Sequence, residues 1–286
     1  MPAGAGRTVL PGGGADTTLK KRIFPALAAL LLLLSLCACG SESTAAFRTV
    51  EVIGTRYYSV ICRKDDKIAA QIDEAMRGLA ASGTLSTLST RYLGGDRITL
   101  RGDSAATANS AEEQTDAAGS TRQTLIVGVE ENFVPMAYEE NGVLRGLSVE
   151  IAAALGEALG WEVVYQPITS AEVDTQLASG NIDCALGFDP LCVNAERYSV
   201  GVTYMESDIV LAVRPESEIN RIRDLKERRI GTQDDPALTA AIQGSEKLVK
   251  YAAGATAYAS LARCVEALDD AWCSAIVVDS LMLTYY

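Results

Sequence analysis

The chain has 286 residues, a formal net charge of −12 at pH 7, seven cysteines and no histidine. A surface this acidic repels the phosphates of nucleic acids, so we exclude nucleic-acid binding. Without histidine the chain cannot build a Ser–His–Asp triad, and without a C-x-x-C pair it lacks the usual ligand spacing of a zinc site, so we expect no metal and no cofactor.

The first forty residues predict export. Basic residues at 20–22 precede an apolar run at 23–38, which is the order found in a secretory signal. The run is shorter than the roughly 18 to 20 residues that span a bilayer. Residues 36–40 read LCACG, which resembles a bacterial lipobox. We therefore predict a lipoprotein signal peptide at 1–38 and an extracytoplasmic protein anchored to the membrane by lipidation of Cys39. An ordinary signal peptide with a chance cysteine is the alternative.

The next segment predicts two strands followed by two helices. After a short polar tether at 39–46, residues 47–53 and 57–62 are rich in Val, Ile and Tyr, which favours strands. Gly54-Thr55-Arg56 predicts a tight connection between these strands. Apolar residues then recur at helical spacing over 68–79, and a second helix is predicted over 85–92.

Residues 103–121 consist almost entirely of small, polar and acidic residues, and this composition predicts a flexible linker. Beyond it, strands and helices alternate, which predicts an α/β domain with largely parallel strands. Strands are predicted at 124–129, 161–167, 183–187, 209–213, 222–225, 229–231 and 275–278, and helices at 148–159, 171–178, 236–242 and 258–268.

Eight short phrases carry a family resemblance by their order and spacing. They are Val127-Gly128-Val129, Asn132-Phe133-Val134-Pro135, Asn141-Gly142 with Gly146, LASGNID at 177–183, Ala195-Glu196-Arg197, DLK at 224–226, IGTQ at 230–233 and AIVVD at 275–279. Together they resemble the amino-acid type of solute-binding proteins of bacterial ABC importers. The resemblance implies a two-lobed periplasmic-binding-protein-like II fold with a hinge between the lobes. It also implies a non-enzymatic receptor that binds an amino acid or amine and delivers it to an ABC permease in the membrane.

The order of the parts differs from that family. Segment 47–102 resembles the family's C-terminal part, with small-lobe strands followed by large-lobe helices, yet it precedes segment 122–286, which resembles the N-terminal part. We therefore predict a circularly permuted, monomeric domain whose old termini are joined by residues 103–121. Two adjacent gene fragments, or two copies that exchange segments, are the alternatives.

The main part of each predicted lobe comes from segment 122–286. The large lobe is expected at 122–205 and the small lobe at 210–286, with residues 64–102 and 47–60 added to them respectively. Two strands are expected to cross between the lobes, one near 206–208 and the other near 61–63.

The resemblance also implies ligand-binding residues. Arg197 matches the family's carboxylate clamp, and Asp279 matches the acceptor of the ligand ammonium on the opposite lobe. Phe133 stands where an aromatic ring contacts the ligand side chain, and Glu130 stands where an acid meets a cationic group. The alternatives are a helix-surface role for Arg197, a helix cap at Asp279 and a core position for Phe133.

Two departures from the family point to the charge of the ligand. Asp189 and Asn194 stand in the loop where the family places Ser or Thr hydroxyls before the arginine, and we include both as candidate ligand contacts. The small-lobe loop reads Asp234-Asp235-Pro236-Ala237, in which carboxylates repel an anionic group and Pro236 has no amide donor. These residues favour a cationic ligand, or the loss of binding.

The sequence leaves two alternative functions open. A sensory or ligand-free module is the first, and a dehydratase-like enzyme that uses Glu130, Asp189 or Asp279 as acid or base is the second.

After loss of the signal peptide and lipidation of Cys39, five cysteines remain. Most are expected to be buried thiols, with a Cys184–Cys192 disulfide as the alternative.

Overall fold

A computed structural model describes residues 46–64, 66–100 and 124–286. The predicted signal peptide, Cys39, most of the tether and the linker 103–121 lie outside these ranges. Among the helices of the described ranges, none combines the length and the apolar character that a membrane span requires.

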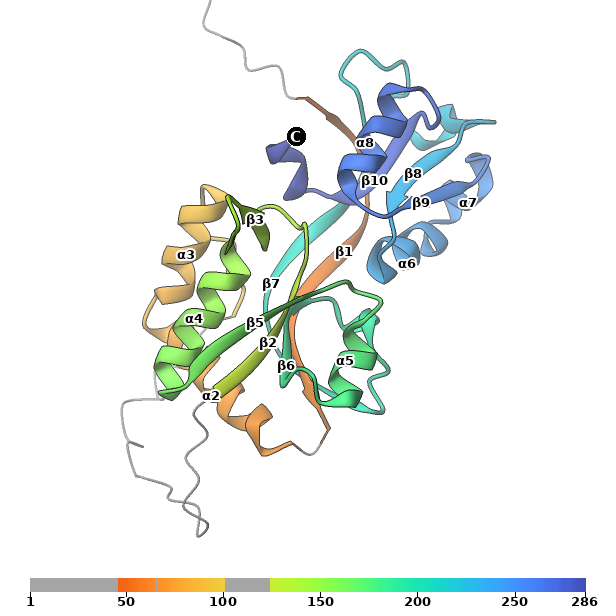
Figure 1. Cartoon of the computed structure of the whole chain (residues 1–286). Coiled ribbons are helices and arrows are strands. Elements are labelled where there is room, and N and C mark those ends of the chain that lie inside the picture. The colour runs from red at the N-terminus through yellow and green to blue at the C-terminus, as the bar shows by residue number, and fades with distance from the viewer. Residues whose placement is uncertain (1–45, 65, 101–123) are drawn as a thin grey trace, which may run out of the picture. The chain divides into compact units, whose positions relative to one another are not determined.

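Eight strands form one mixed sheet, which confirms the predicted α/β class. They are β1 (Arg48–Arg63), β2 (Thr124–Glu130), β5 (Glu162–Ile168), β6 (Cys184–Phe188), β7 (Tyr198–Val213), β8 (Ile230–Gln233), β9 (Ala255–Tyr258) and β10 (Ala275–Asp279). Their order across the sheet is β5-β2-β6-β1-β7-β10-β8-β9 (Figure 1). A separate hairpin pairs β3 (Tyr138–Glu140) with β4 (Val143–Arg145).

The two longest strands, β1 and β7, occupy the middle of the sheet and run antiparallel along their length. One end of β1 also pairs with β6, and one end of β7 also pairs with β10. The pair therefore connects a β5-β2-β6 side with a β10-β8-β9 side, as Figure 1 shows.

Gly54, Thr55 and Arg56 continue β1, so the predicted break between two strands is wrong. The register against β7 shifts around Gly54, and such bulges absorb irregular residues without ending a strand. Glycine is needed there because a Cβ would lie 3.0 Å from the Cβ of Ala241 in helix α6 (Pro236–Gly244). Arg56 consequently lies in mid-strand, opposite Ser207 of β7.

Of the two expected crossings between the lobes, the structure places the one on β7 where it was predicted and the one on β1 earlier in the chain. Residues 206–208 of β7 pair with residues 55–57 of β1, at the passage from one side of the sheet to the other. Ile61 and Cys62, where the crossing of β1 was expected, pair with β6 on the β5-β2-β6 side.

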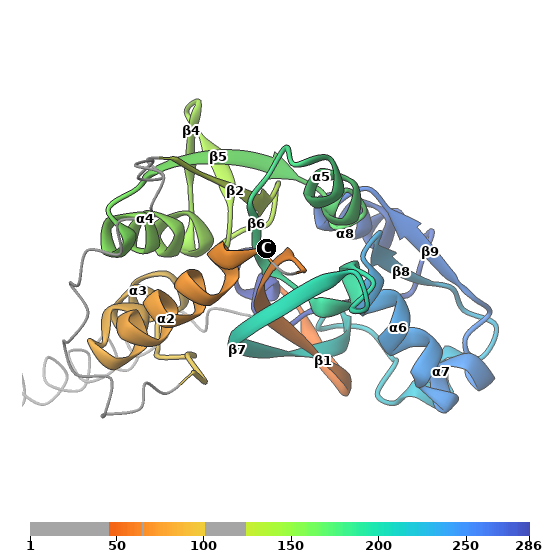
Figure 2. The ribbon, with the colours of Figure 1, turned by 90° about the horizontal axis from the view of Figure 1, so that it is seen from below.

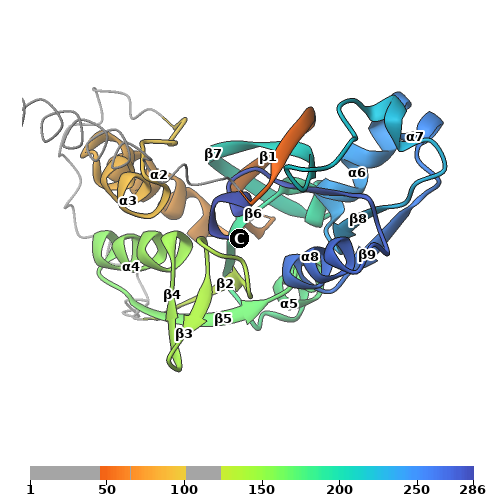
Figure 3. The same cartoon turned by 90° about the horizontal axis from the view of Figure 1, so that it is seen from above.

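Helices pack at both sides of the sheet. The segment before residue 100 supplies α2 (Lys67–Ala81) and α3 (Thr84–Leu93), as predicted, and both contact α4 (Leu147–Leu159). Figures 2 and 3 show these three helices together, at the end opposite α6 and α7 (Glu246–Tyr251). The remaining α-helices of the described chain are α5 (Val173–Ser179) and α8 (Leu261–Asp269).

Two predictions in the last third of the chain are wrong for local reasons. Residues 222–225 form a 3-10 helix, Ile222–Leu225, instead of a strand, because the carboxylate of Asp224 accepts hydrogen bonds from the backbone amides of Asn220 and Arg221. Helix α8 starts at Leu261 instead of 258, because Ser260 caps it and β9 runs to Tyr258.

Segment 46–100 shares its core with the later segment. Tyr58 and Ile72 belong to the same buried cluster as Leu125 and Leu155, so the two segments complete one sheet and one core. The five described cysteines are all free, and four of them are buried, which agrees with the thiol expectation; the alternative Cys184–Cys192 disulfide is not formed.

Candidate functional site

Arg56 is a buried charge at the middle of the molecule, with a side chain that is only 1 % exposed. Its Nη2 donates to Oε2 of Glu130 at 2.6 Å and its Nη1 donates to Oδ2 of Asp235 at 2.8 Å. Its Nε lies 3.9 Å from Oδ2 of Asp279. One guanidinium therefore contacts three carboxylates, and buried charges persist in proteins only where such partners exist.

Two aromatic rings flank the same guanidinium. The Cζ atom of Arg56 lies 4.7 Å from the ring centre of Phe133 and 5.4 Å from that of Tyr58. The two rings are inclined by only 19°, with centres 6.3 Å apart. Both distances are within the range of cation–π attraction. We call Glu130, Asp235, Asp279, Tyr58 and Phe133 the cage.

The cage is assembled from the carboxyl ends of parallel strands. Glu130 ends β2 and Phe133 follows it, while Asp279 ends β10 and Asp235 follows β8. Strand β2 is parallel to β5 and β6, and β10 is parallel to β8. Open α/β sheets place ligands beyond such strand ends, and here the ends of both sides meet around the middle of β1.

Asp279 and Asp235 are held in place by hydrogen bonds. Oδ2 of Asp279 accepts from the hydroxyl of Tyr58 at 2.5 Å and from that of Ser207 at 2.7 Å, and its Oδ1 accepts from the amide of Leu281. Oδ1 of Asp235 accepts from the amide of Leu238, so this residue also caps α6. These bonds fix the orientation of both carboxylates.

Ser170 connects the remaining pair of carboxylates. Its buried hydroxyl lies 2.9 Å from Oε1 of Glu130 and 3.1 Å from Oδ2 of Asp235. A hydroxyl has one hydrogen, so Ser170 donates to one carboxylate at a time. When Glu130 is protonated it donates to Ser170, which then donates to Asp235, and both contacts are satisfied.

If all three carboxylates of the cage were ionised, they would carry more negative charge than Arg56 neutralises. Burial raises the pKa of Glu130 to about 7 even though Arg56 acts to lower it. Burial likewise raises the pKa of Asp279. Burial also acts to raise the pKa of Asp235, but Arg56 and the amide of Leu238 hold that pKa below its ordinary value. Asp235 is therefore the ionised partner of Arg56, and Glu130 is the group that titrates near neutral pH.

The structure brings three of the predicted ligand-binding residues together: Glu130, Phe133 and Asp279 all belong to the cage. Asp189 is buried beside them, but its carboxylate accepts from the backbone amides of Tyr57 and Leu191. It therefore supports the backbone of β1 and a short 3-10 helix and does not contact Arg56.

Two predicted residues lie elsewhere on the described surface. The side chain of Arg197 is 58 % exposed and forms an ion pair of 3.3 Å with Asp174. Asn194 is exposed, and its side-chain oxygen accepts from the amide of Glu196 in the same turn. The structure does not bring Arg197 and Asp279 to one site.

The sequence patterns did not predict Arg56, Tyr58 and Ser170 as site residues. The signal for Arg56 was the period-two alternation of a strand, which places Arg56 on the same face as Tyr58 and Val60. A turn predicted at Gly54-Thr55-Arg56 interrupts this alternation, so the sequence did not place Arg56 within a strand. The sequence points to Asp235 only by its charge, and the structure places its carboxylate against Arg56.

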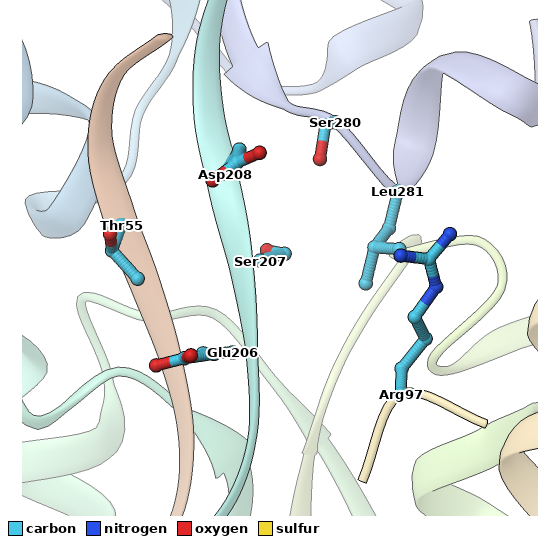
Figure 4. A pocket seen from close by; sticks show the side chains of 7 residues that line it. All are labelled: Thr55, Arg97, Glu206, Ser207, Asp208, Ser280 and Leu281. Carbon is cyan, nitrogen blue, oxygen red and sulfur yellow. The ribbon is translucent and has the colours of Figure 1, made fainter. Parts of the chain in front are cut away.

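Two hollows lie close to the cage. A cavity of about 40 Å³ is lined by Glu130 and Ser170 from one side of the sheet and by Gln233 and Ser260 from the other. A hollow of about 240 Å³ lies next to Ser207 (Figure 4). Its lining residues are Thr55, Arg97, Glu206, Ser207, Asp208, Ser280 and Leu281. Because Ser207 donates to Asp279, it forms the wall between this hollow and the cage.

Comparison with known proteins shows which family the second segment resembles. Residues 125–263 match the model of "Bacterial extracellular solute-binding proteins, family 3". Over 115 residues the chain is 27 % identical to the arginine-binding extracellular protein ArtP of Bacillus subtilis (strain 168), a match that covers 40 % of this chain and 45 % of that protein. The chain thus matches less than half the length of this relative.

A solved structure supports the fold. The structure of an ABC uptake transporter substrate-binding protein from Streptococcus pneumoniae with bound histidine aligns with a TM-score of 0.52 and 23 % identity. The alignment covers 57 % of this chain and 68 % of that one. Residues 125–263 are therefore similar to the bacterial extracellular solute-binding proteins, family 3, and the solved structure shows the same fold.

Proposed function

We propose that the chain is the extracytoplasmic solute-binding component of an ABC importer and that it captures a small cationic solute, an amino acid or amine. The observation that carries the proposal is the cage, which surrounds a guanidinium with carboxylates and two aromatic rings. The function is recognition and delivery without chemical turnover.

The charge of the cage supports a cationic solute. Asp235 is ionised and held by Arg56 and the amide of Leu238, so an anion placed there meets a fixed negative charge. A guanidinium or ammonium instead gains charge-assisted hydrogen bonds in a site from which water is largely excluded. ArtP, which the chain resembles over 115 residues, is named as an arginine-binding protein, and this supports the same class of ligand.

The position of the cage supports ligand-driven closure. Glu130 belongs to the β5-β2-β6 side, whereas Asp235 and Asp279 belong to the β10-β8-β9 side. A ligand that contacts both sides favours the arrangement in which they lie together, and bending at the long strands β1 and β7 is the simplest hinge. The large lobe 122–205 and the small lobe 210–286 are the units that we propose to move.

The order of the segments supports a circular permutation. The family match begins at residue 125, yet β1 lies between β6 and β7 of the same sheet, and α2 and α3 pack on α4. We propose that segment 47–102 is the family's C-terminal part in a new position, joined through 103–121 to segment 122–286.

The anchor is a proposal from the sequence alone. We propose that residues 1–38 are removed and that Cys39 is lipidated, which anchors the protein to the membrane and makes the permease its neighbour there. Growth of the cells with a labelled fatty acid tests this proposal. The wild-type chain and Cys37→Ser should carry the label, and Cys39→Ser should not; a labelled Cys39→Ser chain contradicts the anchor.

A ligand-free module of the same fold is the second candidate, and one observation favours it. Arg56 fills the cage, and the cavity beside it measures about 40 Å³, whereas ordinary ligand pockets measure roughly 300 to 1,000 Å³. A chain that cannot release Arg56 would be closed permanently and would bind nothing in the cage.

A thermal-shift screen separates the two candidates. Purified protein is heated with L-arginine, L-lysine, agmatine or putrescine, with L-glutamate as the control of opposite charge. A solute that binds only the folded chain at about 100 times its dissociation constant stabilises it by about 2.7 kcal/mol. A rise in Tm with a cationic compound and none with L-glutamate supports the receptor. Unchanged Tm values with all compounds contradict it.

A further inference from the structure

Arg56 belongs to the protein but makes the contacts of a ligand. Its guanidinium donates to Glu130 from one side of the sheet and to Asp235 from the other, and it faces the ring of Phe133. Its side chain starts from β1, the strand that runs between the two sides. It therefore bridges both sides, which is the task of a solute in a receptor that closes.

We propose that Arg56 is an intramolecular ligand of the cage, whose guanidinium occupies the place of the cationic group of a solute. The free solute binds only after Arg56 has left. This inference rests on the proposed function of the cage as a cation-binding site, and it adds an occupant supplied by the chain itself.

The contacts engage both terminal nitrogens of the occupant. Both terminal nitrogens of Arg56 have carboxylate partners, and only Nε, at 3.9 Å from Asp279, lacks a hydrogen bond. An arginine fork that binds two carboxylates and faces aromatic rings uses the features that distinguish guanidinium from a simple ammonium. The cage is accordingly built for a guanidinium.

The remaining space excludes a second occupant. The cavity lined by Glu130 and Ser170 measures about 40 Å³, far below the roughly 300 to 1,000 Å³ of ordinary ligand pockets. A solute and the side chain of Arg56 therefore cannot lie in the cage together. Because Arg56 is tethered, its effective concentration at the cage is in the millimolar range or above, and a solute must compete with it.

The competing interpretation is a purely structural ion pair, in which Arg56 neutralises carboxylates that never bind a solute. Loss of stability on removing Arg56 does not distinguish the two interpretations, because an unpaired buried carboxylate destabilises a protein in either case. Competition in the wild-type chain does distinguish them, because only an intramolecular ligand leaves the cage when a free solute enters it. Replacement of the missing atoms by a free molecule is the first step, since it shows that the cage accepts a free guanidinium.

Chemical rescue of Arg56→Ala is the test. N-ethylguanidine supplies the atoms that this substitution removes, and N-ethylurea is a neutral molecule of nearly the same shape. At about 10 mM, we expect N-ethylguanidine to raise the Tm of Arg56→Ala by about 4 °C or more and to change that of the wild-type chain by less than about 1 °C. Equal effects of the two compounds on Arg56→Ala, or equal rescue of the wild-type chain, overturn the inference.

Arg48→Ala is the matched control. Arg48 lies on the same strand, but its guanidinium donates to the backbone carbonyls of Ser217 and Ile219. We expect no difference between N-ethylguanidine and N-ethylurea for this variant. The same selective rescue there would mean that the compound stabilises the folded chain generally, and the inference would be overturned.

A second variant covers the case in which Arg56→Ala does not fold. Arg56→Ala with Asp235→Asn removes one carboxylate together with the cation, and the asparagine oxygen keeps the cap of α6 that Asp235 provides through Leu238. If neither variant folds alone, the yield of folded protein after refolding with each compound is the readout. A higher yield with N-ethylguanidine supports the inference, and equal yields overturn it.

These experiments can reject the proposed function and this inference independently of each other. If the wild-type chain binds a cationic solute but Arg56→Ala shows no selective rescue, the inference is overturned and the receptor stands. If Arg56→Ala is rescued but the wild-type chain binds no solute, the inference is supported and the receptor is rejected. If both hold, Arg56→Ala should bind L-arginine at least about tenfold more tightly than the wild-type chain, because the competitor is gone.

Discussion

The hydroxyl of Tyr58 donates a 2.5 Å hydrogen bond to Oδ2 of Asp279, although the two residues are 221 positions apart in the chain. Both side chains are completely buried. The bond ties β1, from the first segment, to the end of β10, from the second. It also orients the carboxylate that lies nearest to Nε of Arg56.

Tyr58→Phe is therefore expected to destabilise the folded chain by about 1 to 3 kcal/mol, because it removes one donor from a buried carboxylate. Urea unfolding measures the change. Tyr57→Phe is the control, since Tyr57 is 44 % exposed and a surface substitution is expected to change stability by less than about 0.5 kcal/mol. Equal losses in the two variants would contradict the role of the Tyr58–Asp279 bond.

The pH dependence of stability should report Glu130. Its folded pKa of about 7 exceeds the ordinary value of 4.5, so the folded chain binds an additional proton between these pH values. Stability contributed by this group is present at low pH and is lost as the pH rises from about 4.5 to 7. A shift of this size corresponds to about 3 kcal/mol.

Glu130→Gln removes this titration. We expect the free energy of unfolding of the wild-type chain to fall more steeply with pH in that window than that of the variant, as measured by urea unfolding at several pH values. Glu131→Gln is the control, because Glu131 is the exposed neighbour of Glu130. Parallel pH profiles for wild type and Glu130→Gln would contradict the assignment.

Substitutions at Arg197 and Asp235 separate the clamp implied by the family resemblance from the cage. Asp235→Asn should weaken the binding of a cationic solute by about tenfold or more, because it removes an ionised partner of the guanidinium. Arg197→Ala should change that affinity by less than about twofold, because Arg197 is exposed and paired with Asp174. Calorimetric titration measures both, and the reverse order of effects would show that Arg197 is the clamp.

The sequence was sufficient for the fold class, and three of the six predicted ligand-binding residues lie together in the cage. Alternating strands and helices predicted the α/β class, and the family phrases led to Glu130, Phe133 and Asp279. Those residues follow parallel strands directly, so local sequence and topology place them in the site.

The sequence did not predict Arg56 as a site residue, and it predicted Arg197 in a site from which the structure places it apart. Both differences have physical reasons. Arg56 contacts Asp235 across 179 positions, and no local pattern encodes such a contact. Arg197 lies in a loop that departs from the family pattern, and loops set the direction of a side chain less firmly than strands do.

Restoring the family order of the segments tests the permutation. We predict that a chain with residues 122–286 first, followed by a flexible Gly/Ser linker of about 12 residues and then residues 46–100, folds as a monomer. Its Tm should lie within a few degrees of that of the present order. Residues 122–286 alone are the control and should not fold, because β1 lies between β6 and β7. A rearranged chain that does not fold, or that forms only dimers by light scattering, would contradict the permutation.

The most direct test follows Arg56 itself while a solute binds. In a nitrogen-15 spectrum, the Nε–H signal of Arg56, assigned by its loss in Arg56→Lys, should exchange slowly with water because the side chain is buried. When a cationic solute that raises the Tm is added to saturation, this signal should move and exchange rapidly, whereas L-glutamate should leave it unchanged. An unchanged, slowly exchanging Arg56 signal in the solute-bound protein would contradict the claim that Arg56 and the solute compete for one cage.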